Sequence, residues 1–189
     1  GPGLSAKELR ELVDIYREGH PLTQLVLIPE DWQIKTPDIT QYFQLREDRD
    51  WADYVYLIEN LVKLSGKKLA KKKNLISQFI RTYPEYQVIP ITSDKKDVII
   101  RFSEKWRRER NMEGIYLNAE FQAIKNTMEM WDEIPVEGII ICYQNRISAF
   151  SIFSEQTVDM VTEHFEKFDP EMKGSAQVIN WETAKYLQN

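Results

Sequence analysis

The sequence has almost no cysteine: Cys142 is the one cysteine in 189 residues. A disulfide within the chain is therefore excluded, which suits a reducing environment, so we expect a cytoplasmic protein. Cys142 lies in the apolar run IIICY. Because a free cysteine in such surroundings behaves as a small hydrophobe, we interpret it as a core residue and not as a nucleophile.

Histidine is also scarce, and its two copies, His20 and His164, lie far apart in the sequence. Together with one cysteine they give no metal-ligand spacing, so we expect no metal. A Walker-type phosphate loop and a G-x-S-x-G nucleophile elbow are absent as well. No apolar run approaches the roughly 20 residues that cross a bilayer, and no signal peptide is recognisable, so we expect no transmembrane segment.

The rest of the composition is typical of a globular protein. Hydrophobic residues make up 42% of the chain and charged residues 29%, and five Trp, nine Tyr and eight Phe supply core material. The length suffices for one good core or for two small ones that share an interface. A formal net charge of −5 argues against DNA binding by the whole surface.

Positive charge gathers in one segment of this acidic chain. Six lysines lie between Lys63 and Lys73, and Asn74 follows them at the start of an amphipathic helical pattern. Such a segment would contact a polyanion through interactions that depend on salt and largely not on the sequence of the polyanion. The alternative is a solvated helix face on which lysine stems cover apolar surface. Both interpretations stay open on the residues alone.

Hydrophobic spacing predicts mixed secondary structure. In the first half, Ser5 and Glu8 form a capping-box pattern that opens a helix, and a basic helix runs from Gly66 to Pro84. Short strands are expected at 24–28, 42–45 and 54–56. In the second half we expect strand 87–91, helices 96–110 and 118–131, strands 136–143, 147–153 and 158–165, and helix 175–187.

Two separated stretches carry a more specific signal. The first has the string D-Y-x-Y…E-x-L…L-x-GKK…K-N…F at Asp53, Tyr54, Tyr56, Glu59, Leu61, Leu64, Gly66, Lys67, Lys68, Lys73, Asn74 and Phe79. The second has HFEK…G…IN-x-E-x-A at His164, Phe165, Glu166, Lys167, Gly174, Ile179, Asn180, Glu182 and Ala184. In these two stretches the sequence resembles the C-terminal domain of bacterial phosphatidylglycerol lysyltransferases and of their soluble relatives. Lys63, Lys71 and Lys72 fall outside the match.

The resemblance implies an α+β fold with mixed sheets, because this family is built from two GNAT-type acyltransferase folds in tandem. Residues 1–83 would be the later part of a first GNAT-like unit, and residues 84–189 the first two-thirds of a second. The expected order after Gln87, strand, two helices, three strands and a helix, fits this interpretation. We therefore expect a fragment whose fold the remainder of the parent chain completes, since the missing strands would leave an open sheet edge.

The activity that the resemblance implies is acyl or aminoacyl transfer. An activated acyl group would pass from a coenzyme A thioester or an aminoacyl-tRNA to an amine or hydroxyl acceptor, helped mainly by proximity and oxyanion stabilisation. The rival hypothesis is a non-catalytic module that keeps the fold and uses the basic helix for an anionic partner. On either hypothesis, the motif-matching residues Lys67, Lys68, Lys73 and Asn74 are the candidate anion-binding residues.

The loop before the last helix is a candidate cofactor site, at Lys173, Gly174 and Ser175. GNAT-type enzymes hold the cofactor pyrophosphate at this place, and free N–H groups at a helix N-terminus bind anions generally. The alternative is an ordinary strand-to-helix turn with Ser175 as N-cap.

Glu166 is the candidate general base for the attacking amine or hydroxyl, a role that requires burial to raise its pKa towards neutrality. His164 is the second candidate, and strand alternation would place both on one face. A structural carboxylate beside Lys167 is the alternative. Tyr54, Tyr56 and Glu59 are expected in the core or along a tunnel wall.

Overall fold

We describe a computed structural model of the chain, which covers residues 4–26, 28, 30–47, 49, 52–109 and 115–188. The chain divides into two compact units, Gly1–Val55 and Tyr56–Asn189. Each unit is described separately below.

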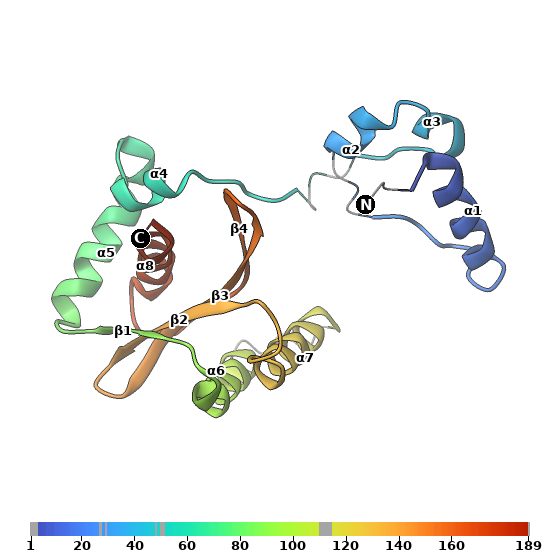
Figure 1. Ribbon diagram of the computed structural model, residues 1–189. Helices are drawn as coiled ribbons and strands as arrows, with labels where there is room; N and C mark the ends of the chain where they lie inside the picture. Colours follow the sequence, from blue (N-terminus) through green and yellow to red (C-terminus); the bar gives the residue numbers. More distant parts are fainter. Residues whose placement is uncertain are drawn as a thin grey trace. The chain divides into compact units, whose positions relative to one another are not determined.

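The first unit contains three helices in its described residues, α1 (Ala6–Arg17), α2 (Glu30–Lys35) and α3 (Ile39–Tyr42) (Figure 1). The capping box predicted at the start of α1 is confirmed: Ser5 Oγ accepts from the Glu8 N–H, and the Glu8 carboxylate accepts from the Ser5 N–H. The strands expected at 24–28, 42–45 and 54–56 are wrong in their described residues. Residues 24–26, 28 and 52–57 are irregular, and Tyr42 ends α3. Short apolar runs do not distinguish strand from loop by themselves.

The second unit is built around a four-stranded antiparallel sheet in the order β1-β2-β3-β4. Its strands are β1 (Gln87–Pro90), β2 (Glu137–Tyr143), β3 (Arg146–Thr157) and β4 (Met160–Phe168). The β2–β3 turn is made by Gln144 and Asn145, both at positive φ (47° and 63°). That conformation matches the right-handed twist of a two-residue hairpin, so the two strands expected at 136–143 and 147–153 pair directly.

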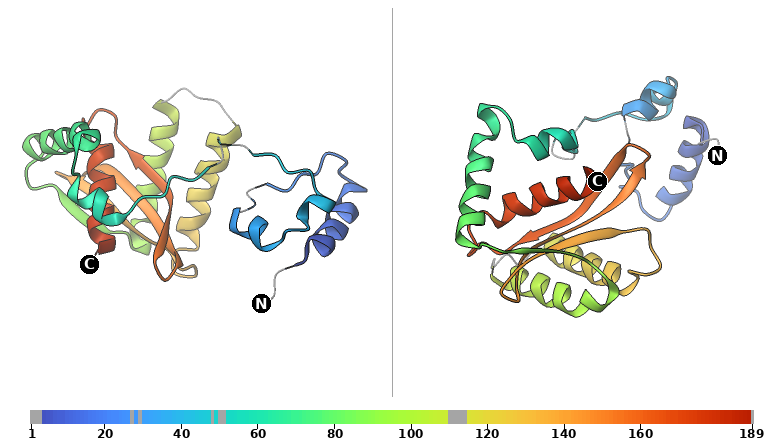
Figure 2. Two further views of the ribbon diagram at one scale, coloured as in Figure 1. Left: turned by 90° about the horizontal axis from the view of Figure 1, so that it is seen from above. Right: turned by 60° about the vertical axis from the view of Figure 1, so that its left-hand side comes forward.

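Helices cover both faces of this sheet (Figures 1 and 2). One face packs against α5 (Ala70–Thr82) and α8 (Ser175–Gln188), with Phe79, Ile139 and Ile179 in its core. The other packs against α6 (Lys96–Glu109) and α7 (Ile115–Glu129), with Ile99, Ile140 and Phe150 in its core. The short helix α4 (Ile58–Lys63) and the 3₁₀ turn η2 (Lys67–Leu69) precede α5, and η3 (Ser93–Lys95) precedes α6.

This arrangement confirms the α+β class and the element order expected after Gln87. Consecutive residues of β2 point to opposite faces: Ile139 and Ile141 meet α5 and α8, whereas Ile140 meets α6 and α7. Burial on both faces explains the continuous apolar run that surrounds Cys142 in the sequence. The sheet is antiparallel throughout its described residues and not mixed.

Strand β4 contains an irregularity that sets the position of its ionisable residues. Phe165 is paired with Ile152 of β3, but the next β3 residue, Phe153, is paired with Glu163 and not with His164. His164 is thus an extra residue in β4, a bulge that interrupts the simple alternation of side chains. As a consequence, Glu163 and Glu166, three positions apart, both lie on the face that α8 covers.

Gly174 fixes how α8 begins beside α5. Its φ is +93°, and a Cβ at this position would lie 2.5 Å from the Leu75 carbonyl oxygen and 3.0 Å from Phe79 Cβ. Gly66 has nearly the same φ, +90°, yet a Cβ there would meet nothing within 4 Å. Substitution of Gly66 would therefore cost only backbone strain, whereas substitution of Gly174 would cost backbone strain and a steric clash.

We predict that Gly174→Ala lowers the free energy of unfolding by roughly 3 kcal/mol or more, because conformational strain and overpacking add. Gly66→Ala should cost only about 1–2 kcal/mol, from strain alone. Urea denaturation of both variants measures the difference. Equal losses would contradict the close packing of Gly174 against α5.

Candidate functional site

Glu166 lies near the C-terminal end of β4, on the face that α5 and α8 cover. It is paired with the fully buried Ser151 of β3. Its atom Oε2 is buried and has no hydrogen-bond partner among the described residues. A carboxyl group in this situation is costly to ionise, because it loses water without gaining full compensation from the protein.

The neighbours of Glu166 only partly compensate for its burial. Burial, followed by the negative charge of Glu163, raises its pKa from 4.5 to about 7. A hydrogen bond from the Asn180 side chain on α8 and the positive charges of Lys72 and Lys167 act in the opposite direction. Near neutral pH the group therefore exists in both protonation states, which suits proton transfer.

The second carboxylate of the site is Glu163, which the bulge brings to the same face. Ser151 donates a hydrogen bond from Oγ to Glu163 Oε1 over 2.5 Å. Glu163 as a residue is exposed, but partial loss of water around its carboxyl raises the pKa of Glu163, and this hydrogen bond partly offsets the effect. The sequence analysis did not single out Glu163, because perfect alternation would place residues 163 and 166 on opposite faces.

Lys72 supplies the positive charge from α5. Its side chain is half-buried, and its ammonium lies 5.9 Å from the centroid of the Tyr56 ring. The sequence analysis set Lys72 aside because it falls outside the family motif. Among the lysines of the basic segment, Lys72 is nevertheless the one whose charge acts on Glu166.

The motif lysines lie elsewhere on the surface. Lys67 and Lys68 are exposed in η2, and Lys73 and Asn74 are exposed on the first turns of α5. Lys63 instead forms an ion pair with Glu59 over 2.8 Å. The anion-binding role of Lys67, Lys68, Lys73 and Asn74 stays a prediction.

Two expectations about aromatic and catalytic residues are corrected. Tyr54 and Tyr56 are 86% and 57% exposed and do not belong to the core, and Glu59 is exposed as well. His164 does not share the environment of Glu166: its Nε2 lies 2.7 Å from Ser154 Oγ, and its ring is exposed. The bulge removes the simple alternation on which that expectation depended.

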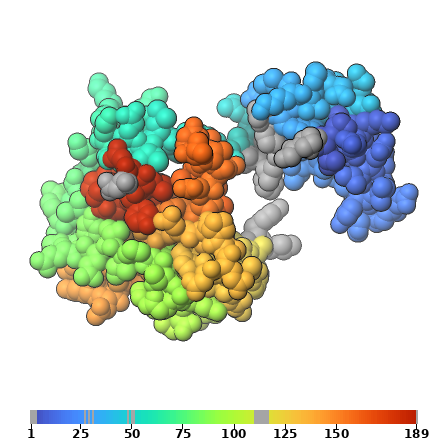
Figure 3. Space-filling model, viewed as in Figure 1, coloured from blue at the N-terminus to red at the C-terminus, as the bar shows by residue number. Residues whose placement is uncertain are grey.

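The loop before α8 is held by its own contacts. Asp169 is buried, accepts hydrogen bonds from the Arg146 guanidinium, and accepts the Ser175 hydroxyl at its main-chain oxygen over 2.8 Å. Gly174 and Ser175 are buried as well, whereas Lys173 is exposed. In Figure 3 α8 lies beside the α4–α5 segment that covers it. The cofactor role of Lys173, Gly174 and Ser175 stays a prediction, and of the three only Lys173 is exposed.

Comparison with known proteins matches residues 25–189 to the family described as "Phosphatidylglycerol lysyltransferase, C-terminal". The chain belongs to this lysyltransferase C-terminal family. A solved structure is also similar: a conserved protein of unknown function from Bacteroides thetaiotaomicron, 28% identical, with a TM-score of 0.82. The match covers 99% of this chain and 64% of that one, so the chain spans less than two thirds of its solved relative. No curated protein matches significantly.

In this member of the lysyltransferase C-terminal family, neighbouring residues of α8 have different structural roles. Glu182 is a packing residue: it is buried, accepts a hydrogen bond from the Tyr86 hydroxyl, and pairs with Lys185 over 2.8 Å. Trp181 donates from its indole N–H to the Val62 carbonyl and so ties α8 to α4. Asn180, one residue earlier, faces Glu166.

Crossing a membrane and holding a metal ion each require features that the described part of the chain lacks. None of its helices combines the length and the apolarity that crossing a bilayer requires. Nor do the described residues bring together three His, Cys, Asp or Glu side chains in a way that could hold a metal ion.

The raised pKa of Glu166 predicts a pH-dependent stability. In the unfolded chain the group ionises near 4.5, whereas in the folded protein it stays protonated up to about 7. The folded state therefore binds more protons between these values, and its stability falls as pH rises through them. Relative to wild type, Glu166→Gln should gain about 2 kcal/mol between pH 5 and pH 8.

Urea denaturation of both proteins at the two pH values measures this gain. Glu155→Gln, at an exposed position of β3, is the matched control and should show none. A difference between wild type and Glu166→Gln that does not change with pH would rule out the raised pKa.

Proposed function

We propose that the protein is an acyl- or aminoacyltransferase in which Glu166 is the general base. The observation that carries this proposal is the buried Glu166 carboxyl, whose pKa of about 7 lies close to the operating pH that general acid–base catalysis favours. Family membership supports the reaction class, since the family name describes a lysyltransferase.

In the proposed step, the nitrogen or oxygen of the acceptor attacks the acyl carbonyl carbon of the donor. A new C–N or C–O bond forms, the C–S bond of a thioester or the C–O bond of an ester breaks, and Glu166 takes the proton from the acceptor. The leaving group departs as a thiolate or an alkoxide, and Glu166 can protonate it with the proton it received. The protein thus returns to its initial protonation state.

The donor in this proposal is a coenzyme A thioester or an aminoacyl-tRNA, both of which carry phosphates. Lys67, Lys68, Lys73 and Asn74 provide an exposed anion-binding surface that precedes and opens α5. In the loop before α8, Gly174 and Ser175 are buried, so Lys173 is the residue that would contact the cofactor.

The same proposal includes the GNAT-like arrangement of two tandem units, 1–83 and 84–189. The support for the GNAT-like unit 84–189 is its order of one strand, two helices, three antiparallel strands and a helix. Strand β4 is an edge strand in the described part of the chain. A further strand that pairs with β4 would complete the sheet on this side.

The alternative is a binding module without catalysis. It is favoured by the exposed lysines themselves: Lys67, Lys68, Lys71 and Lys73 form no ion pair within the described residues. A surface of uncompensated cations attracts an anionic partner whether or not Glu166 takes part in chemistry.

The catalytic role predicts a pH-dependent activity. With a panel of coenzyme A thioesters and aminoacyl-RNA mimics as donors, transfer should rise with pH as Glu166 ionises near pH 7. Glu166→Gln should lower kcat/KM by about 10²–10⁴-fold and abolish this rise. Donor binding should stay unchanged in the variant, as calorimetry would show.

Transfer by Glu166→Gln at the wild-type rate would refute the catalytic role. Binding of a donor without transfer by the wild-type protein, even when lengthened to match the solved relative, would favour the binding module.

The lysine surface makes a separate prediction. The double variant Lys67→Ala/Lys73→Ala should bind an aminoacyl-RNA mimic more weakly and with a shallower salt dependence, since each phosphate contact contributes to the slope. The matched control is Lys105→Ala/Lys125→Ala, which removes the same charge from α6 and α7. Equal effects in both double variants would indicate loss of general attraction and not of a site.

A further inference from the structure

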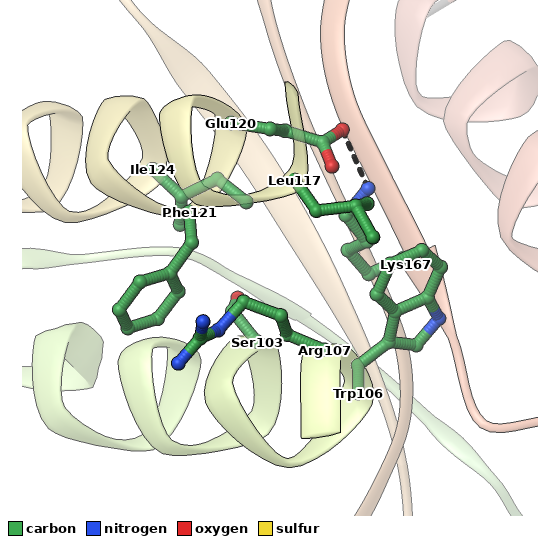
Figure 4. A pocket seen from close by; sticks show the side chains of 8 residues that line it. All are labelled: Ser103, Trp106, Arg107, Leu117, Glu120, Phe121, Ile124 and Lys167. Carbon is green, nitrogen blue, oxygen red and sulfur yellow. Dashed lines mark hydrogen bonds and ion pairs between the residues drawn. The ribbon is translucent and has the colours of Figure 1, made fainter. Parts of the chain in front are cut away.

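A small cavity lies between α6, α7 and the Lys167 side chain of β4 (Figure 4). It is on the face of the sheet that α6 and α7 cover, whereas Glu166 lies on the opposite face. The space open to the centre of a water-sized sphere is about 10 Å³, so the cavity can hold one small occupant. Apolar side chains form part of its wall, including Leu117, Phe121 and Ile124. The remaining wall is polar, and its hydrogen-bonding groups indicate what the cavity can hold.

Two hydrogen-bonding groups at this cavity have no partner in the described part of the chain. Ser103 is 3% exposed, and its Oγ makes no hydrogen bond there. Arg107 Nε is buried and likewise makes none there. The two residues are four positions apart on α6 and therefore lie on the same side of the helix. Buried polar groups are normally hydrogen-bonded, so this pair calls for a partner in the cavity.

The chemistry of these groups selects an acceptor. Arg107 Nε is a donor only, and the Ser103 hydroxyl can donate as well. The guanidinium of Arg107 uses NH1 to donate to the amide oxygen of Asn118 over 2.6 Å, and it stacks 5.2 Å from the Phe121 ring centroid. Neither neighbour carries a charge. Arg107 has no ion pair within the described residues.

The charge of the cavity also favours an anion. Its lining holds two cations, Arg107 and Lys167, and one carboxylate, Glu120. Glu120 is already engaged by Lys167, whose ammonium lies 2.6 Å from its oxygen and 4.2 Å from the Trp106 ring centroid. Arg107 is half-buried with its Nε buried, and no carboxylate among the described residues forms an ion pair with it, so its charge favours an anionic occupant.

We propose that this cavity binds a small anion, of the size of chloride, which accepts hydrogen bonds from Arg107 Nε and Ser103 Oγ. The site joins α6 to α7 and rests against Lys167 of β4. It is independent of the transferase proposal, because it lies on the other face of the sheet and requires no acyl donor.

The first test is thermal unfolding of the protein in sodium chloride and in sodium gluconate at constant ionic strength. Gluconate is too large for the cavity. The unfolding midpoint should rise with chloride and reach a plateau, as expected for a ligand that binds the folded state. In Ser103→Ala the apparent chloride affinity should fall about tenfold, the effect of one lost hydrogen bond to a charged group.

Arg107→Lys, which lacks Nε, provides a second variant and should lose the chloride effect. Arg108→Lys, at the exposed neighbouring position, is the matched control and should retain it. Equal midpoints in chloride and gluconate, or unchanged chloride affinity in both cavity variants, would overturn the proposal and indicate that water fills the cavity.

A crystal grown in sodium bromide gives a direct readout, since bromide replaces chloride and scatters anomalously. The proposal requires an anomalous peak between Ser103 Oγ and Arg107 Nε. A cavity without such a peak at saturating bromide would overturn it.

Discussion

Strand β4 places two adjacent ionisable side chains, Glu166 and Lys167, on opposite faces of a sheet whose faces are both covered by helices. The two groups are compensated to different degrees. Lys167 has Glu120 at 2.6 Å and the Trp106 ring at 4.2 Å, so its charge is well matched. Glu166 has the Asn180 side chain and the charges of Lys72 and Lys167 in its favour, and the negative charge of Glu163 acts against them. Because desolvation outweighs these attractions, the protein holds an acid of nearly neutral pKa where an ordinary surface carboxylate would be fully ionised.

This imbalance depends on one extra residue. Without the bulge at His164, Glu163 would point to the other face and its negative charge would no longer act on Glu166 at close range. Lys72 works against Glu163 from α5, and the position of α5 relative to α8 depends in turn on Gly174. The pKa of Glu166 therefore depends on the bulge in β4, on the packing of α5 and α8, and on Gly174. This dependence links the packing of the second unit to its proposed chemistry.

Much of this arrangement could be predicted from the sequence. Capping at Ser5, the adjacent strands at 136–143 and 147–153, and the order of elements after Gln87 follow from local patterns, and the fold agrees with them. The pairing register is a property of two strands together, so neither the bulge nor the role of Glu163 could be read from β4 alone. Lys72 was missed for a related reason: motif matching ranks residues by identity, whereas its effect on Glu166 arises from tertiary packing. The short apolar runs near residues 24 and 42 were wrongly expected to be strands, because an isolated strand has no stabilising partner.

The surroundings of Glu166 hold its pKa near neutrality, and the titration of this one group can be measured directly. Carboxyl carbon NMR of the isotope-labelled protein, with the Glu166 signal assigned from its absence in Glu166→Gln, would follow this one group from pH 3 to pH 9. The account predicts a midpoint at about 7. A midpoint close to the ordinary value of 4.5 would show that the site is solvated and would contradict the proposed role of Glu166 as general base.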